Sequence, residues 1–297
     1  MAQRPILITG GTGQLAVALE NAARAHGLAA IRVGRPAFDF DRPDSIGACF
    51  RSANPSMVLN AAAYTAVDAA EDDAEAATRA NRDGPAALAA LCAAAGVPLL
   101  HVSTDYVFDG LKGAAYVETD PTAPQGVYGA TKLAGEQAVL ASGARALILR
   151  TSWVYAPTGK NFVRTMLNAG LKNSHLRVVA DQQGCPTSAE DLAGAMIAIA
   201  ARILADGWND RFAGIFNAAG TGATTWHRFA VAIFEEAARH GRAIPTVEPI
   251  VTADWPTRAH RPADSRLDCA KLERVFGLRL PPWRDSLART VDTLLSA

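Results

Sequence analysis

A tyrosine and a lysine four residues apart, Tyr128 and Lys132, form the pair in this sequence that is best suited to proton transfer. On a helix this spacing places both side chains one turn apart on the same face. A free phenol, whose pKa is roughly 10, is a weak acid at neutral pH, and a nearby ammonium group lowers that pKa. Such a phenol can donate a proton to an oxygen that gains negative charge. The same spacing is also typical of an exposed Tyr–Lys pair, so its interpretation depends on the surrounding elements.

A glycine-rich turn near the start of the chain supplies that context. Residues 5–9 are expected to form a short apolar strand, residues 10–16 read GGTGQLA, and a helix is expected to follow to about residue 26. The spacings Gly11-x-Gly13-x-x-Ala16 and Gly10-x-x-Gly13 both fit a dinucleotide turn, whose backbone approaches a pyrophosphate at the N-terminus of a helix. Because the turn stands between a strand and a helix, it predicts a nucleotide site rather than a plain tight turn.

The end of the second expected strand, residues 29–33, bears on the choice of coenzyme. An acidic residue there favours a free ribose 2′-hydroxyl, whereas an arginine accommodates a 2′-phosphate. Gly34 and Arg35 follow this strand, and the nearest acids, Asp39 and Asp41, come later. Arg35 therefore favours NADPH, with NADH as the alternative, although a solvated loop arginine explains the residue equally well.

Strands and helices alternate through the first half of the chain. Further strands are expected at residues 57–60, 98–103 and 146–149, and further helices at 43–52, 66–81, 84–95 and 127–142. This alternation predicts an α/β fold with a doubly wound, mainly parallel, Rossmann-like sheet. Ligands bind such sheets outside the carboxyl ends of the strands. The glycine turn, residues 60–65, Thr104 and Thr151 should therefore meet at one crevice.

The pattern is looser beyond residue 150. Helices are expected at 161–171, 189–204, 226–240 and 287–295, and strands at 176–179 and 215–217. Prolines at 245, 249, 256, 262, 281 and 282 predict connections built from loops. We therefore expect a dinucleotide-binding domain over residues 1–150 and a smaller substrate-binding lobe over residues 151–297. Residues of about 180–217 are expected to return to the sheet.

Composition excludes several other classes of protein. Lys and Arg number 29 and balance 29 Asp and Glu, so we expect no nucleic-acid partner and no binding to an anionic membrane. The longest apolar run, residues 192–204, contains Arg202 and is too short to cross a bilayer. Four widely spaced cysteines without CxxC suit reduced thiols in the cytoplasm, and six scattered histidines predict no metal site. A homodimer is compatible with the sequence.

Several segments in the same order resemble a known family. They are residues 9–13 (TGGTG), 60–68 (NAAAYTAVD), 103–108 (STDYVF), 128–136 (YGATKLAGE), 150–155 (RTSWVY), 181–187 (DQQGCPT), 224–227 (TTWH) and 261–267 (RPADSRL). This set resembles the extended short-chain dehydrogenase/reductases, and more narrowly the dTDP-4-dehydrorhamnose reductases. The departures are Ala16 at the third glycine and the Gly34-Arg35 pair.

The resemblance implies NAD(P)H-dependent reduction of a nucleotide sugar, the C4 ketone of dTDP-4-dehydro-6-deoxy-L-mannose, to dTDP-L-rhamnose. Tyr128 would protonate the C4 oxygen, Lys132 would hold the nicotinamide ribose and lower the tyrosine pKa, and Thr104 would polarise the carbonyl. The implied substrate contacts are Val67, Thr104, Asp105, Tyr106, Tyr128 and Trp153. With Arg35 added from the reasoning above, the expected cofactor contacts are Gly10, Thr12, Gly13, Gln14, Leu15, Arg35, Asp39, Phe40, Ala61, Ala62, Ala63, Tyr64, Thr65, Tyr128 and Lys132.

Two other functions share this fold. A sugar-nucleotide dehydratase usually carries Thr-Asp-Glu, and Tyr106 occupies the position of the glutamate that removes a proton at C5. A phenol does not readily replace a carboxylate base, so dehydration is disfavoured. A non-catalytic, NADP-binding regulatory subunit is the second alternative, and the presence of both Tyr128 and Lys132 argues against it.

Overall fold

A six-stranded sheet forms the centre of the computed structural model, which describes residues 4–296. Its strands lie in the order β10-β5-β4-β3-β1-β2, and each neighbouring pair is parallel. The strands are β1 (Ile6–Thr9), β2 (Ala30–Val33), β3 (Met57–Asn60), β4 (Leu99–Thr104), β5 (Ala146–Thr151) and β10 (Gly214–Asn217). The predicted α/β, doubly wound fold is confirmed, and β10 from the second half of the chain extends the sheet beyond β5.

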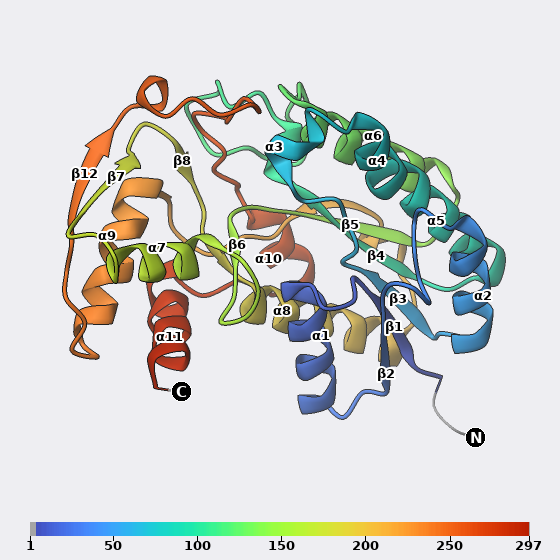
Figure 1. Cartoon of the computed structure of the whole chain (residues 1–297). Helices are drawn as coiled ribbons and strands as arrows, with labels where there is room; N and C mark the ends of the chain where they lie inside the picture. Colours follow the sequence, from blue (N-terminus) through green and yellow to red (C-terminus); the bar gives the residue numbers. More distant parts are fainter. Residues whose placement is uncertain (1–3, 297) are drawn as a thin grey trace.

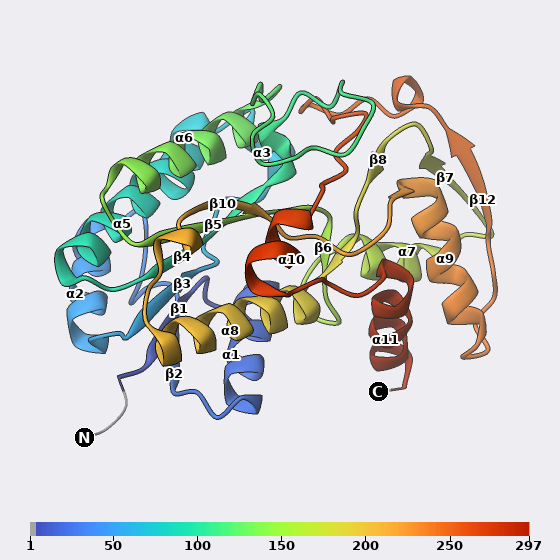
Figure 2. The ribbon, with the colours of Figure 1, turned by 180° about the vertical axis from the view of Figure 1, so that it is seen from behind.

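Helices cover both faces of this sheet (Figures 1 and 2). One face carries α1 (Gln14–Ala25), α8 (Ala189–Asp206) and α10 (Ala270–Phe276), and the other carries α2 (Pro43–Ala53), α5 (Gly84–Ala95) and α6 (Val127–Ala141). Successive side chains of a strand point to opposite faces. Ile6 and Ile8 accordingly pack into the core beside α1 and α8, and Leu7 packs into the core beside α2 and α5. Burial on both faces explains why these strands read as continuous apolar runs.

A smaller lobe lies at the end of the molecule away from α2 (Figure 1). It contains α7 (Phe162–Gly170), α9 (Trp226–Ala238) and α11 (Trp283–Leu295), with β7 (His175–Val179) paired in parallel with β12 (Thr246–Ile250). Short pairs, β6 (Val154–Tyr155) with β9 (Thr187–Ser188) and β8 (Gln183–Gly184) with β11 (Thr224–Thr225), connect it to the sheet. The domain boundary at residue 150 stays a prediction.

The single helix expected over residues 66–81 is wrong. The chain instead forms α3 (Val67–Ala70), α4 (Ala74–Thr78) and a π-helical turn over Arg79–Asp83 that continues into α5. The Asp73 side chain accepts a hydrogen bond from the Ala76 backbone N–H and caps α4. An aspartate at this position starts a new helix by satisfying an otherwise unpaired amide, so it breaks a run that helix propensity alone would continue.

The expectation of a loop-built second half is also partly wrong. Strand β12 and helix α10 were not predicted, and α11 begins at Trp283 rather than at residue 287. Pro249 is tolerated within β12 because the strand pairs with β7 on one side and leaves its other edge free of sheet partners in the described chain. Single-turn 3₁₀ helices cover Asp105–Val107, Asp210–Phe212 and Thr252–Asp254. Over residues 4–296, no helix combines the length and apolar character that crossing a membrane requires.

Candidate functional site

A cavity of about 1150 Å³ opens at the carboxyl ends of the central strands. Strands β2 and β3 lie on opposite sides of β1, so the strand order reverses there, and such switch points are where α/β sheets bind ligands. The structure brings every cofactor, substrate and catalytic residue expected from the sequence to the wall of this one cavity. Their individual roles remain predictions. The wall also includes residues that the sequence did not single out, among them Arg32, Ser103, Gly159 and Lys160.

The glycine turn leaves room for a ligand against bare backbone. Gly10 adopts φ +114°, and a Cβ there would lie 3.0 Å from the carbonyl oxygen of Ala61. A Cβ on Gly34 would lie 2.4 Å from Cα of Gly11. Gly13 caps α1 without a side-chain hydrogen bond, so the first amides of the helix face the cavity unblocked. This cradle fits a pyrophosphate, which combines negative charge with several hydrogen-bond acceptors.

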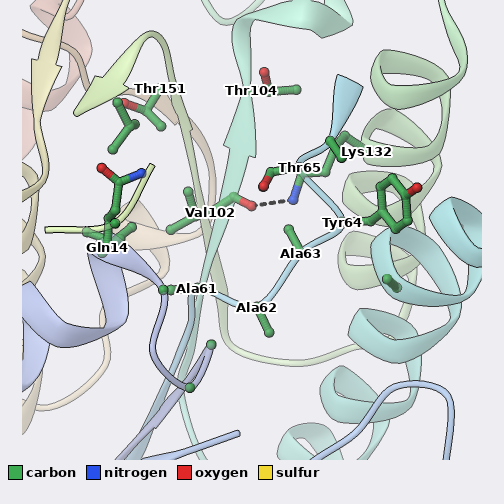
Figure 3. A pocket seen from close by; sticks show the side chains of 18 of the residues that line it. Gln14, Ala61, Ala62, Ala63, Tyr64, Thr65, Val102, Thr104, Lys132 and Thr151 are labelled. Carbon is green, nitrogen blue, oxygen red and sulfur yellow. Dashed lines mark hydrogen bonds between the residues drawn. The ribbon is translucent and has the colours of Figure 1, made fainter. Parts of the chain in front are cut away.

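Two asparagines hold the stretch that joins β3 to α3 along the cavity. Asn60 accepts hydrogen bonds through Oδ1 from the Thr9 hydroxyl at 2.6 Å and from the Ala62 amide at 3.2 Å. Asn81 accepts a bond from the Tyr64 amide at 2.8 Å and donates to the Tyr64 carbonyl at 3.1 Å. The amide groups therefore fix the backbone of residues 61–65, whose side chains line the cavity (Figure 3).

Arg35 lies at the rim of the cavity, at the end of β2. Its guanidinium pairs with Asp39 at 3.1 Å and with Asp41 at 3.0 Å, and the side chain keeps 68% of its surface exposed. An exposed arginine held by two loop carboxylates can meet a phosphate, because its planar group still has free donors. Its expected preference for a 2′-phosphate stays a prediction.

Lys132 and Tyr128 both reach the cavity from the first turns of α6. The Glu71 carboxylate accepts a hydrogen bond at 2.8 Å from the amide of Val127 and holds the start of this helix. Lys132 is buried, and its Nζ donates to the carbonyl oxygen of Val102 at 2.6 Å, as Figure 3 shows. Burial lowers the pKa of Lys132 to about 8, with the charge of Glu136 opposing the shift.

The expected lowering of the Tyr128 pKa is wrong for this structure. Loss of solvent around the hydroxyl raises the pKa of Tyr128 above its ordinary value, and the nearby Thr104 hydroxyl offsets only part of the rise. Lys132 instead directs its ammonium group to a strand carbonyl. The phenol is therefore protonated at neutral pH but is a weaker acid than a free tyrosine, so it can give up its proton only to an oxygen that becomes strongly basic.

Thr104 ends β4 beside this pair and is tied to the turn that follows. Its hydroxyl donates to Oδ1 of Asp105 at 3.0 Å and accepts from the amide of Tyr106 at 3.2 Å. Asp105 is only 2% exposed, and burial raises its pKa to about 6. Asp105 Oδ2, Ser103 Oγ and Thr151 Oγ1 are buried and have no hydrogen-bond partner within residues 4–296. All three residues line the cavity, but these oxygens are themselves shielded from solvent.

Tyr106 is held from the far end of the chain. Arg261 donates to the Tyr106 hydroxyl at 2.9 Å and to Asp68 at 2.6 Å, and Asp68 also accepts from the amide of Ala259 at 3.2 Å. The Tyr106 ring meets Tyr128 edge to face with centroids 5.5 Å apart. The sequence alone did not reveal these contacts of Arg261 with Tyr106 and Asp68, although Arg261 begins one of the segments that carry the family resemblance.

Across residues 4–296, no three or more His, Cys, Asp or Glu side chains gather in a way that could hold a metal ion. The parallel sheet, the glycine turn before α1 and the Tyr-x-x-x-Lys pair beside Thr104 together define a short-chain dehydrogenase/reductase type of protein.

Comparison with known proteins narrows this class. The chain belongs to the family described as the RmlD substrate binding domain, which matches residues 4–296. It is 46% identical to a dTDP-4-dehydrorhamnose reductase of Sinorhizobium fredii, over 98% of this chain and 97% of that protein. A crystal structure of such a reductase from Clostridium acetobutylicum is 35% identical with a TM-score of 0.89, covering 98% of this chain and 99% of that one. A Bacillus anthracis reductase in complex with NADP is 31% identical with a TM-score of 0.88, covering 97% and 99%.

Proposed function

We propose that this protein reduces the C4 ketone of dTDP-4-dehydro-6-deoxy-L-mannose to dTDP-L-rhamnose, with NADPH as the preferred coenzyme. The main support is the convergence of Tyr128, Lys132 and Thr104 on the cavity that also contains the glycine turn. The near-full-length similarity to proteins named dTDP-4-dehydrorhamnose reductase supports the same reaction and substrate. The NADP complex of the Bacillus anthracis relative supports the coenzyme.

The residues of the cavity wall suit the binding of this coenzyme. The amides at the start of α1, exposed by Gly10 and Gly13, would receive the pyrophosphate, and Arg35 would meet the 2′-phosphate. Lys132 would hold the nicotinamide ribose. Bound NADPH supplies the hydride that reduces the ketone. A change of hydrogen-bond partner by Lys132, from the Val102 carbonyl to the ribose, would accompany binding.

Protonation of the reduced oxygen falls to Tyr128. Its phenol is protonated at neutral pH and would give up the proton as negative charge develops on the C4 oxygen. The Thr104 hydroxyl, which donates to Asp105 in this structure, would turn to donate to that same oxygen. The nucleotide sugar would contact Val67, Asp105, Tyr106 and Trp153, and residues between 151 and 160 complete the cavity wall from the second half of the chain. Burial raises the pKa of Tyr106 and keeps its phenol protonated, which makes it unsuited to act as the base of a dehydratase.

The proposed reaction consumes NADPH, so the decisive measurement is the fall in absorbance at the NADPH band after addition of the purified ketosugar nucleotide. Wild-type protein should oxidise one NADPH per ketone reduced. Tyr128→Phe should keep its affinity for NADPH and lose on the order of 100- to 10,000-fold in turnover. Binding of NADPH without any oxidation would instead favour the regulatory-subunit alternative, and wild-type turnover in Tyr128→Phe would remove this residue from its role.

We also propose a cytoplasmic location and a homodimer. The four cysteines are all free, in keeping with a reducing compartment. Light scattering of the purified protein, compared with the 31.2 kDa of one chain, tests the oligomeric state. A monomer mass at micromolar concentration would contradict the dimer.

A further inference from the structure

Trp153 has an unusual backbone for a bulky residue. It comes two residues after the end of β5, lines the cavity, and adopts φ +48° in the left-handed region. L-residues with large side chains rarely adopt this conformation, and it persists only where the surroundings determine it strongly. The cause therefore lies in what holds the indole, rather than in the local preference of the chain.

The indole of Trp153 is held between two groups that are distant in the sequence. The ring of Trp226 stacks on it with centroids 3.5 Å apart and planes 8° from parallel. The backbone of Gly184 lies so close to the indole that a Cβ at this position would be 2.4 Å from its Cε2 atom. Gly184 pairs with Thr224 between β8 and β11, which fixes its position next to the start of α9.

Trp226 is itself firmly anchored in the smaller lobe. It is the first residue of α9, where the Thr225 hydroxyl caps the helix by accepting from the amide of Arg228 at 3.2 Å. Phe162 packs against it with centroids 4.6 Å apart, and Phe229 lies beyond in the core of the lobe. Trp226 does not itself line the cavity within the described part of the chain. Of the three aromatic rings that Trp226 contacts, Trp153 is the one that lines the cavity.

We propose that Trp226 is a positioning residue that fixes the Trp153 indole at the wall of the cavity, where it would meet the nucleotide sugar. This inference rests on the proposed function, which makes the bound molecule a nucleotide sugar. A stacked indole has one face covered by its neighbour and cannot swing away without breaking an aromatic contact. The Trp153 indole is therefore preorganised, so that substrate binding does not bear the cost of ordering it. The coenzyme, held at the glycine turn, gains nothing from this contact.

The test compares Trp226→Leu with Trp226→Phe and uses Trp208→Phe as a matched control. Trp208 lies beside Phe212 and packs against the core that contains α1 and α8, whereas Trp226 packs against the separate core of the smaller lobe. We expect Trp226→Leu to raise the KM for the ketosugar nucleotide roughly 2- to 13-fold, as loss of one aromatic pair implies. Its turnover at saturation and its Kd for NADPH should stay within about threefold of wild type. Trp226→Phe should recover most of the loss, and Trp208→Phe should change none of these values.

Two further readouts separate positioning from general damage. The far-ultraviolet circular dichroism couplet of the stacked indoles should disappear in Trp226→Leu and remain in Trp208→Phe. In a double-mutant cycle, Trp226→Leu should add little to the KM effect of Trp153→Leu, because both act through the Trp153 indole. A wild-type KM in Trp226→Leu after loss of the couplet would overturn the inference, as would an equal loss of NADPH affinity.

Direct binding distinguishes this inference from the proposed function. Calorimetry with dTDP-L-rhamnose in the presence of NADP⁺ requires no turnover. If the wild-type protein does not bind this product, the proposed function fails. If wild type binds it and Trp226→Leu binds it equally well, the function stands and the role of Trp226 fails.

Discussion

Substitution of Gly129 by alanine tests how tightly helix α6, which carries Tyr128, is packed against the 3₁₀ turn that carries Tyr106. Gly129 follows Tyr128 directly in α6, and a Cβ there would lie 2.2 Å from the backbone carbonyl oxygen of Tyr106. It would also lie 3.0 Å from Cβ of Pro124. Real Cβ contacts do not fall below 3.0 Å, so helix and turn must separate by about 0.8 Å, the difference between 3.0 and 2.2 Å. Neither partner is the flexible end of a side chain.

Two opposing terms set the effect of Gly129→Ala on stability. Overpacking costs roughly 1–3 kcal/mol, whereas alanine gains about 1 kcal/mol over glycine within a helix. The net loss of about 0–2 kcal/mol corresponds to a fall in Tm of up to about 3 °C for a chain of this size. Activity should suffer far more, because a misplacement of about 1 Å in a catalytic group costs on the order of 100-fold in rate. We therefore expect kcat to fall roughly 10- to 100-fold.

Gly194→Ala is the matched control for this prediction. Gly194 also lies inside a helix, α8, and a Cβ there would meet no atom within 4 Å. We expect this variant to keep its kcat and to gain about 0.5–1 kcal/mol in unfolding free energy. NADPH oxidation and thermal unfolding of the two variants are the measurements. A Gly129→Ala enzyme with wild-type kcat and Tm would refute the steric reasoning.

Three other perturbations test separate parts of the site. Burial raises the pKa of Asp105 from 3.8 to about 6, so its ionised form costs stability as the pH rises from about 4 to about 6. Asp105→Asn should therefore raise the unfolding free energy at pH 7 by up to about 3 kcal/mol, and leave it unchanged near pH 3. Thermal unfolding at the two pH values measures this, and a difference that does not depend on pH would contradict it. Arg35→Ala should raise the KM for NADPH about tenfold and leave the KM for NADH unaltered. Equal changes in the two KM values would show that Arg35 does not select between the coenzymes. Arg261→Gln and Asp68→Asn should each weaken binding of the nucleotide sugar. The loss of binding free energy in the double variant should be smaller than the sum of the two single losses by about 1–2 kcal/mol. Strictly additive losses would show that Arg261 and Asp68 do not act together.

The sequence by itself determined the features that depend on short-range pattern. The α/β fold follows from apolar strands alternating with helices, and the cradle before α1 follows from glycine spacing next to a strand. Parallel strands must present their carboxyl ends at one edge, so the convergence of Thr104 and residues 60–65 on one cavity could be expected before any coordinates. The break before α4 was in principle readable from Asp73, whose capping role is local.

Only the tertiary structure decided the features that depend on contacts between distant residues. The Arg261–Asp68 pair joins positions 193 residues apart, and nothing in either local segment selects the partner. The stack of Trp226 on Trp153 likewise depends on how the smaller lobe meets the sheet. The pKa of Tyr128 shifts opposite to the direction expected from its lysine, because loss of solvent outweighs a charge directed elsewhere. Burial is a property of the packed chain as a whole, and a four-residue spacing cannot encode it.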